Sequence, residues 1–476
     1  MFSHQSDAQY VTILGNAPDY AGSVLTFYSI DNYFCNSETK MGECMVADNG
    51  DFSVRFHSPN ARLIYTYLGV FKARFYVEPD FSYEVKLPPR TDKSPEEKEN
   101  PFFEEATVLM NILSVKDNHD QNVPLENELN FMIFKFDETF NPLFDHLAVE
   151  ALTRRQPALL DSIIHHFREN LPKTGNHYFD QYALYRSGLL YYAAQRRGVR
   201  SISNDYFAHK PLLYDNEAYM ELFKTTYSRY FEHFGRANDA IYEVINRQGS
   251  FGGLKRLLAH DGVLPTDSLR ELVILKNIYD EFYSNNFSRG ALLHVLDSAI
   301  VHSNIERHRL LAGEIRSKIT KLLRGFEPPS FELFRHDSTL VSLQHYRGKF
   351  VYLMFCTTQN YACLTQYELL ENLYRSHHQW LHIVIVSVDE RLSDMSSFRE
   401  KNGYKWDFLH FGNDPDILEK YDVRIFPTSF FIDTEGKLVL SPAPNPNNNL
   451  ERSFWIELRN RGLWQEYFQK GWIIFD

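Results

Sequence analysis

The chain has 476 residues, more than the size at which a single hydrophobic core keeps growing, so two or three domains are expected. Its formal net charge of −12 argues against nucleic-acid binding, because contact with phosphates needs a basic surface. The sequence contains no run of about eighteen apolar residues, so no transmembrane segment is predicted in this chain.

Residues 10–87 carry the pattern of short strands. Runs rich in β-branched and aromatic residues alternate with turn residues, and they lie at 11–14, 24–28, 51–56, 63–68, 73–77 and 82–86. Short strands at this spacing are typical of a small antiparallel sandwich. We therefore predict a β-sandwich domain over residues 1–88.

Cys35 and Cys44 bracket a polar segment inside this first domain. In an oxidising compartment the two thiols could close a short disulfide across the ends of two strands, which would stabilise the fold by about 2–3 kcal/mol. The alternative is a pair of unpaired, partly buried thiols.

Residues 88–101 concentrate proline and charge, with almost no large apolar side chain. The glutamates of this stretch are expected to form a solvated charge run rather than an acidic ligand site. We predict that residues 89–126 are a linker or a surface excursion.

From residue 127 the apolar residues recur at helical spacing. The stripes lie within 159–167, 182–193, 222–234, 269–282 and 292–322, and loops at 172–175, 209–211 and 262–265 separate them. The pattern predicts an all-α domain of about seven helices over residues 127–324. Aromatic stretches such as 177–182 are expected to be core, the alternative being a groove that receives a peptide or a glycan.

The histidines do not form a pattern that holds a metal. His165 and His166 are neighbours on a predicted helix and do not face one another, and His377, His378 and His382 have no cysteine or carboxylate at ligand spacing. We therefore predict no metal site and no cofactor.

Residues 325–476 alternate between strands and helices. A wholly apolar run at 350–355 suits a strand buried on both faces, and helical spacing begins at Leu364. Later strands are expected at 382–388 and 429–432. The alternation predicts a mixed sheet with helices on both faces, and the whole chain is predicted to be multidomain α+β.

Three motifs in this last region resemble the thioredoxin-like domain of the TlpA/ResA-type thiol-disulfide oxidoreductases of the bacterial cell envelope. They are Pro329-Ser330-Phe331-Glu332-Leu333, then Leu343-Gln344-His345-Tyr346-Arg347-Gly348-Lys349, and Val423-Arg424-Ile425-Phe426-Pro427-Thr428 with the following 431–437 segment. The resemblance covers 325–462 and implies a thioredoxin fold with a cis-proline at Pro427. The turn Asn49-Gly50-Asp51-Phe52 resembles less specifically the N-terminal β-domains joined to such proteins in Bacteroidetes.

The redox motif of that family is incomplete here. Its Cys-x-x-Cys falls on Asn360-Tyr361-Ala362-Cys363, so Asn360 occupies the position of the attacking thiol and Cys363 that of the resolving thiol. Disulfide exchange needs a thiolate to form the mixed disulfide, and an amide side chain supplies none. The resemblance therefore predicts a redox-inactive polypeptide-binding or scaffold protein.

An atypical oxidoreductase is the alternative function. Cys363 could act alone, or with Cys356 at the end of the preceding strand, although six residues separate the two cysteines and a direct bond needs the loop to fold back. Each thiol could also simply be packed in the core. The candidate catalytic residues are Cys356 and Cys363.

The same site can bind without exchanging disulfides. In the family the residue before the cis-proline offers its backbone to an extended peptide, which here points to Phe426 and Pro427 together with Gln359, Asn360 and Tyr361. The predicted partner is an extended polypeptide or another envelope protein. The first seven residues are polar and show no signal peptide, and the resemblance rather than the composition favours the periplasm or outer envelope.

Overall fold

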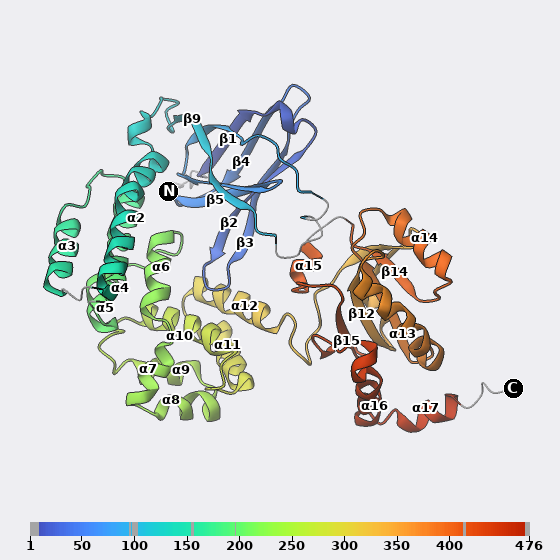
Figure 1. Cartoon of the computed structure of the whole chain (residues 1–476). Helices are drawn as coiled ribbons and strands as arrows, with labels where there is room; N and C mark the ends of the chain where they lie inside the picture. The colour runs from blue at the N-terminus through green and yellow to red at the C-terminus, as the bar shows by residue number, and fades with distance from the viewer. Residues whose placement is uncertain are drawn as a thin grey trace, which may run out of the picture. The chain divides into compact units, whose positions relative to one another are not determined.

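The computed structural model describes residues 9–471 apart from 95–96, 98–102, 154–156, 196 and 413–415. The chain divides into two compact units: one consists of Met1–Asp92 and Glu104–Lys318, and the other of Lys93–Phe103 and Ile319–Asp476. Figure 1 shows strands β1 to β9 and helices α2 to α12 in the first unit, and the elements from β10 onward in the second. No helix of the described residues is long and apolar enough to cross a membrane.

Two β-sheets that share one apolar core begin the first unit. The first has the order β4 (Asp51–His57), β1 (Tyr10–Asn16), β7 (Ser82–Lys86), β9 (Asn111–Lys116). The second has the order β3 (Ser37–Met45), β2 (Val24–Asn32), β5 (Arg62–Leu68), β6 (Phe71–Val77), β8 (Ala106–Leu109). Strand β4 alternates exposed and buried residues, so Phe52, Val54 and Phe56 enter the core. The sheets are not wholly antiparallel, because β1 pairs with β7 and β6 with β8 in parallel.

The segment 89–126, for which the sequence predicts a linker or a surface excursion, is partly folded into strands. It contains β8 and β9, which lie at the ends of the two sheets and continue the sandwich beyond residue 88. The apolar pattern missed both strands because they are short and most of their residues are not buried, which leaves little alternation to detect. Residues 95–96 and 98–102 of the charged stretch lie outside the described residues.

The disulfide considered between Cys35 and Cys44 does not form, and both cysteines are free. The segment between them is not a loop: it is strand β3, and Cys44 lies opposite Leu25 near the far end of the β2–β3 hairpin. Seven residues of extended strand span roughly 23 Å, which is far beyond disulfide reach. Cys35 is buried at the turn, where its Sγ lies 3.0 Å from Ser37 Oγ.

The helices follow the sandwich in the same unit. They are α2 (Leu129–Thr153), α3 (Pro157–Glu169), α4 (His177–Ala193), α5 (Val199–Tyr206), α6 (Glu217–Thr226), α7 (Tyr230–Ala237), α8 (Ala240–Glu243), α9 (Phe251–Leu258), α10 (Asp267–Glu281), α11 (Arg289–His302) and α12 (Glu306–Thr320). Two of the predicted stripes, 222–234 and 292–322, are each divided between two helices. Asn176, Asn216, Ser250 and Thr266 cap helix N-termini through their side chains. Phe179 and Tyr182 of the aromatic stretch are buried, as expected for core residues.

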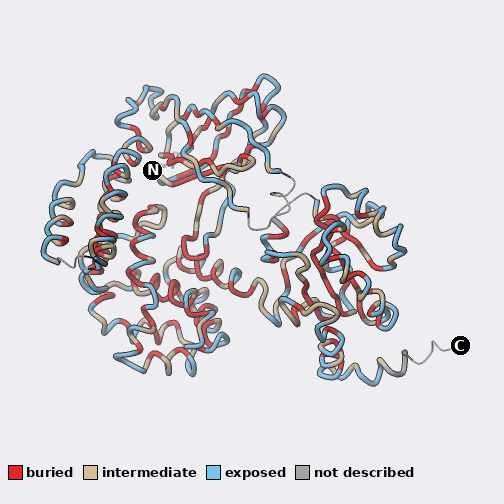
Figure 2. The backbone as a smooth tube through the Cα atoms, viewed as in Figure 1, coloured by how far each residue is buried: buried red, intermediate tan, exposed pale blue. Residues whose placement is uncertain are grey.

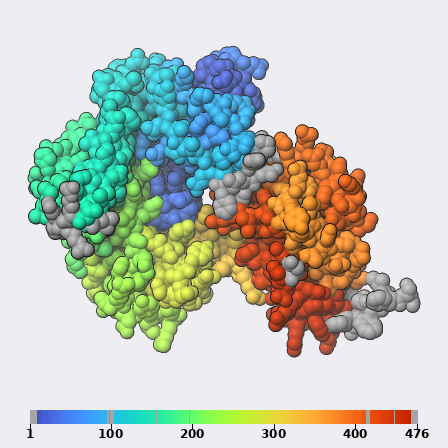
Figure 3. Space-filling view, in the orientation of Figure 1, coloured from blue at the N-terminus to red at the C-terminus, as the bar shows by residue number. Residues whose placement is uncertain are grey.

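Polar contacts join the sandwich to the helices. Tyr76 Oη donates a 2.6 Å hydrogen bond to Glu217, and Asn32 donates one of 2.9 Å to Glu314. Arg62 pairs at 3.1 Å with both Asp31 and Asp215. Strands and helices therefore form one compact unit, although the sequence pattern separates them at residue 127. In the space-filling view they make one continuous surface (Figure 3).

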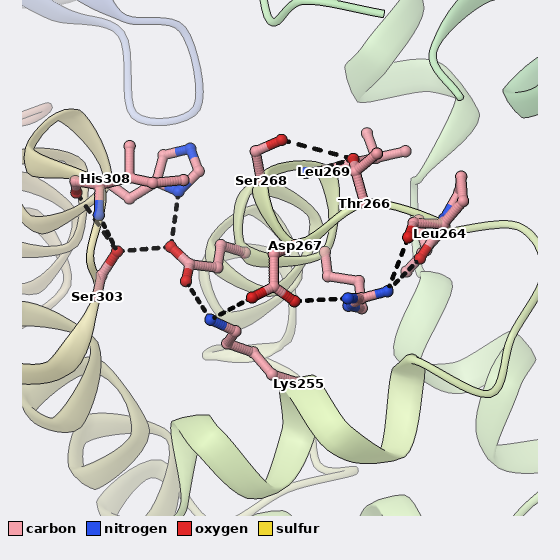
Figure 4. Close-up of polar contacts among 12 residues, drawn as sticks. Lys255, Leu264, Thr266, Asp267, Ser268, Leu269, Ser303 and His308 are labelled. Carbon is pink, nitrogen blue, oxygen red and sulfur yellow. Dashed lines mark hydrogen bonds and ion pairs between the residues drawn. The ribbon is translucent and has the colours of Figure 1, made fainter. Parts of the chain in front are cut away.

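A buried polar network lies between helices α9, α10 and α12 (Figure 4). Glu271 accepts a 2.6 Å hydrogen bond from Lys255 Nζ and one of 2.5 Å from Ser303 Oγ, and it lies 2.9 Å from His308 Nδ1. The other ring nitrogen of His308 lies 2.7 Å from Tyr214 Oη. Burial opposes ionisation of Glu271, but these hydrogen bonds outweigh it and lower the pKa of Glu271 to about 2.

The second unit is built on a seven-stranded mixed sheet. The order is β11 (Leu340–Ser342), β10 (Glu332–Arg335), β14 (Asp407–His410), β13 (Leu381–Ser387), β12 (Phe350–Cys356), β15 (Thr428–Ile432), β16 (Leu438–Leu440). Its helices are α13 (Tyr361–His377), α14 (Leu392–Asn402), α15 (Asp416–Lys420), α16 (Glu451–Asn460) and α17 (Trp464–Gly471). Successive residues of β12 enter two different apolar clusters, so the strand is covered on both faces (Figure 2). The predicted multidomain α+β fold with a thioredoxin-like C-terminal domain is confirmed.

Candidate thiol-disulfide site

The candidate site lies where the central strand β12 turns into helix α13. Cys356 is the last residue of β12, and Cys363 is in the first turn of α13. The two cysteines form a disulfide with a Cα–Cα distance of 5.8 Å. The loop between them therefore folds back as a direct bond requires, because α13 packs along the face of the sheet to which Cys356 points.

Both cysteines of this disulfide are wholly buried. They belong to the same apolar cluster as Tyr367, Leu370 and Phe408. A thiolate must approach a disulfide sulfur directly to attack it, so this closed arrangement shields the bond from a large thiol substrate.

Asn360 has a structural role at the start of α13. It is the N-cap of α13, and its side-chain oxygen accepts hydrogen bonds from the N–H groups of Ala362 at 2.8 Å and Cys363 at 3.3 Å. These donors would otherwise be unsatisfied at the start of the helix, so Asn360 stabilises the helix terminus that covers the disulfide.

The loop 357–360 is held over the sulfurs by further hydrogen bonds. Thr357 donates its backbone N–H to Cys363 Sγ at 3.4 Å, and Asn360 donates its own to Thr357 Oγ1 at 3.1 Å. Buried Asp389, after the end of β13, accepts hydrogen bonds from the backbone N–H of Thr358 at 3.0 Å and from its hydroxyl at 2.8 Å. The loop is thus fixed from two directions.

Asp389 is a residue of this site that the sequence analysis did not select. A carboxylate directly after a buried parallel strand was the available signal, because the carboxyl ends of parallel strands lie along one edge of a sheet. Burial, together with the nearby Asp389, raises the pKa of Tyr367 well above its usual value, so this phenol stays protonated. Tyr367 donates its hydroxyl to the carbonyl of Thr357 at 3.4 Å.

The proline loop lies opposite the end of β12. Phe355 pairs with Thr428 across the β12–β15 ladder, which places Pro427 next to Cys356 in the register. The Phe426–Pro427 peptide bond is cis. Phe426 is half-buried and packs against the cluster that contains both cysteines.

The other predicted binding residues are on the surface. Gln359 and Asn360 are exposed, and Tyr361 has 80% of its side chain accessible. Ile425, just before the proline loop, is also exposed. Exposed amide and apolar side chains are therefore present at the start of α13 and just before the proline loop. Among the described residues, no group of three or more His, Cys, Asp or Glu could hold a metal ion.

The disulfide gives a direct prediction of thiol content. Denatured but unreduced protein is expected to react with a thiol reagent at two positions, Cys35 and Cys44, and at four after reduction. In the Cys363→Ser variant the unreduced protein should show three reactive thiols, because Cys356 loses its partner. Four reactive thiols in the unreduced wild type contradict the pairing.

Sheet order and site together define a class. Strand β12 lies between parallel β13 and antiparallel β15, and helix α13 follows it with a cysteine in its first turn, as in a thioredoxin fold. Residues 325–441 match the AhpC/TSA family model. The chain is 30% identical over 116 residues to the thiol-disulfide oxidoreductase ResA of Bacillus subtilis, which covers 24% of this chain and 64% of the relative. ResA of Bacillus anthracis is 28% identical over 120 residues, covering 25% of this chain and 69% of the relative.

Solved structures are also similar to part of the chain. The thioredoxin domain of a thiol-disulfide oxidoreductase from Bacteroides vulgatus is 24% identical and covers 28% of this chain and 95% of its own, with a TM-score of 0.26. A thiol:disulfide interchange protein from a Bacteroides species is 23% identical and covers 29% and 90%, with a TM-score of 0.25. The C-terminal domain of this chain is TlpA/ResA-like and has the thioredoxin fold.

Proposed function

We propose that the C-terminal domain binds extended polypeptide through the surface formed by Gln359, Asn360, Tyr361, Phe426 and Pro427, without exchanging disulfides. One observation carries this proposal: both cysteines are wholly buried, while Tyr361, two residues before Cys363, is 80% exposed. In this proposal the Cys356–Cys363 disulfide is a structural cross-link, and Asn360 replaces a nucleophile with a helix cap.

The surface suits a polypeptide for two reasons. An exposed aromatic ring such as Tyr361 supplies a large contact area at low conformational cost, and Ile425 adds a second exposed apolar side chain. The backbone beside a cis-proline also offers hydrogen-bonding groups to an extended chain, in the manner of an added strand. The partner is an unfolded segment or a segment of another envelope protein, and no cofactor is needed.

A second candidate function is favoured by the disulfide itself. An external thiolate would attack Cys363 Sγ, the bond to Cys356 would break, and Cys356 would leave as a thiolate. A second thiol of the substrate would then resolve the mixed disulfide, so that the substrate is oxidised and the cysteine pair reduced. This reaction needs the loop 357–360 to open, because both sulfurs are buried in the closed form.

Either function places the protein in an oxidising compartment. A disulfide persists outside the reducing cytosol, so we propose the periplasm or the outer cell envelope as its location.

Two measurements separate the candidates. For polypeptide binding, the protein should not accelerate insulin reduction by dithiothreitol, and permanently unfolded, carboxymethylated lactalbumin should bind. Tyr361→Ser should weaken that binding at least fivefold, because about 1 kcal/mol of contact is lost. Tyr283→Ser, which removes a tyrosine that is 64% exposed in the other unit, is the matched control and should have no effect.

The cysteine variants decide the second candidate. Cys356→Ser and Cys363→Ser should still bind lactalbumin if the surface alone recognises the chain. Insulin reduction by the wild type that is lost in both variants would instead establish the oxidoreductase.

A further inference from the structure

The first unit contains a groove that the proposed function does not use. It has a volume of about 740 Å³ and lies between strands β8 and β9 and helix α2. Its apolar lining includes Leu109, Leu125, Phe131 and Phe134, and each of these side chains is exposed. Exposed apolar side chains that gather around one groove are characteristic of interaction sites.

Helix α2 is apolar on two sides. One side is buried through Ile133, Phe136 and Phe140, which explains why the helix packs against its neighbours. Phe131 and Phe134 are three residues apart, so they are neighbours on the helix surface, and they line the groove. Phe131 and Phe134 are 38% and 42% exposed, so this second apolar side is only partly covered.

Among the described residues, strand β8 is an edge strand of its sheet, and Thr107 to Leu109 of this strand line the groove. It is the last strand of its sheet and pairs with β6 in parallel. Ala106 and Met110 donate their N–H groups to Val70 and Arg74 on the β6 side, at 2.9 Å each. Because hydrogen bonding alternates along a strand, the N–H groups of Thr107 and Leu109 point away from β6.

Beyond the end of β8, a side chain takes the place of a neighbouring strand along β6. The Asn130 side chain accepts a hydrogen bond from Tyr76 N–H at 2.6 Å and donates one to the Tyr76 carbonyl at 2.8 Å. A side-chain amide thus imitates a paired strand at that position. The outward groups of β8 belong to an edge strand, which an extended segment can pair with.

Most of the charged residues that line the groove are acidic. Its lining has three carboxylates, Glu128, Asp137 and Glu138, against one cation, Arg74. Burial raises the pKa of both Glu128 and Asp137, although hydrogen bonds from Asn130 and the nearby Arg186 guanidinium, respectively, oppose the shift. Lys135 shows how a cation is held here: its Nζ lies 5.5 Å from the Phe134 ring and 2.9 Å from Glu138.

We propose that this groove binds an extended polypeptide segment, which pairs with the edge of β8, inserts apolar side chains between Leu109 and Phe134, and places a lysine or arginine near Glu138. The edge of β8 fits a segment with an extended backbone. The exposed aromatic rings fit apolar side chains of that segment, and the carboxylates fit a basic side chain. The site lies in a different unit from the thioredoxin-like surface, so it stands or falls independently of the proposed function.

The test uses the full chain and a library of immobilised short peptides in which apolar, acidic and basic residues vary at alternate positions. Peptides with apolar residues and at least one lysine or arginine should be selected over acidic ones. Leu109→Ser should then raise the Kd of a selected peptide about tenfold, which corresponds to the loss of one buried leucine. Leu113→Ser is the matched control, because Leu113 is similarly exposed, 49% against 57%, but does not line the groove.

A backbone variant tests the edge itself. Thr107→Pro removes an N–H that points away from β6, so the sheet should stay folded while peptide affinity falls roughly threefold to tenfold. Thermal unfolding monitored by circular dichroism verifies that the Leu109→Ser and Thr107→Pro variants are folded.

The proposal is wrong if the library selects no peptide, if acidic peptides are preferred, or if Leu109→Ser binds like the wild type. A dimer in analytical ultracentrifugation that Leu109→Ser dissociates would identify a second copy of the chain as the occupant and overturn the proposal.

Discussion

Glu271→Ala is expected to lower the free energy of unfolding by about 3–5 kcal/mol. The carboxylate is almost wholly buried and is the common partner of Lys255, Ser303 and His308. Its removal leaves Lys255 without its closest partner and His308 without its Nδ1 contact in an apolar interior, which is the costly way to break a buried network. Urea unfolding at neutral pH measures the loss.

The matched control is Glu243→Ala. Glu243 is also a helical glutamate in an ion pair, at 3.2 Å from Arg247, but it is exposed, so its loss should change stability by less than about 1 kcal/mol. Equal effects of the two substitutions would show that the Glu271 network does not stabilise the fold.

The same residue gives the stability a defined dependence on pH. The pKa of Glu271 is lowered from 4.5 to about 2 in the folded protein, so its contribution is fully present above pH 4.5 and is lost as the pH falls toward 2. Glu271→Gln removes this titration while keeping the shape. Between pH 5 and 3 the wild type should lose about 1–2 kcal/mol more than that variant in urea unfolding.

The double variant Asn360→Cys, Cys356→Ala is expected to turn the C-terminal domain into an active dithiol. It restores the two-residue spacing of the family motif, because the new thiol and Cys363 lie at the start of α13. The N–H groups of Ala362 and Cys363, which now bond to Asn360, would stabilise a thiolate at that position and lower its pKa. Insulin reduction should be at least tenfold faster than with the wild type.

The controls for this gain of activity are Asn360→Ser with Cys356→Ala, which lacks the new thiol, and Cys356→Ala alone. Neither should accelerate insulin reduction. A wild-type rate equal to that of the double variant would mean that the Cys356–Cys363 pair already performs the exchange.

The sequence determined the fold of the C-terminal domain and where its residues depart from the Cys-x-x-Cys pattern. The apolar run at 350–355, the helical spacing after Leu364 and the Phe426-Pro427 pair are local signals, because each depends on residues that are near one another in the chain. The same local alignment placed Asn360 at the position of the attacking thiol. Periodicity of two against 3.6 likewise separated the strands before residue 88 from the helices after 127.

Only the tertiary structure decided which cysteines pair and what covers them. Cys356 and Cys363 meet because α13 packs on the face of β12 that carries Cys356, whereas Cys35 and Cys44 are kept apart by the extended strand β3. Spacing in the sequence is similar for both pairs, at six and eight intervening residues, so it cannot distinguish a loop from a strand. The roles of Asp389, the Glu271 network and the edge of β8 arise from contacts between residues far apart in the chain, which packing alone brings together.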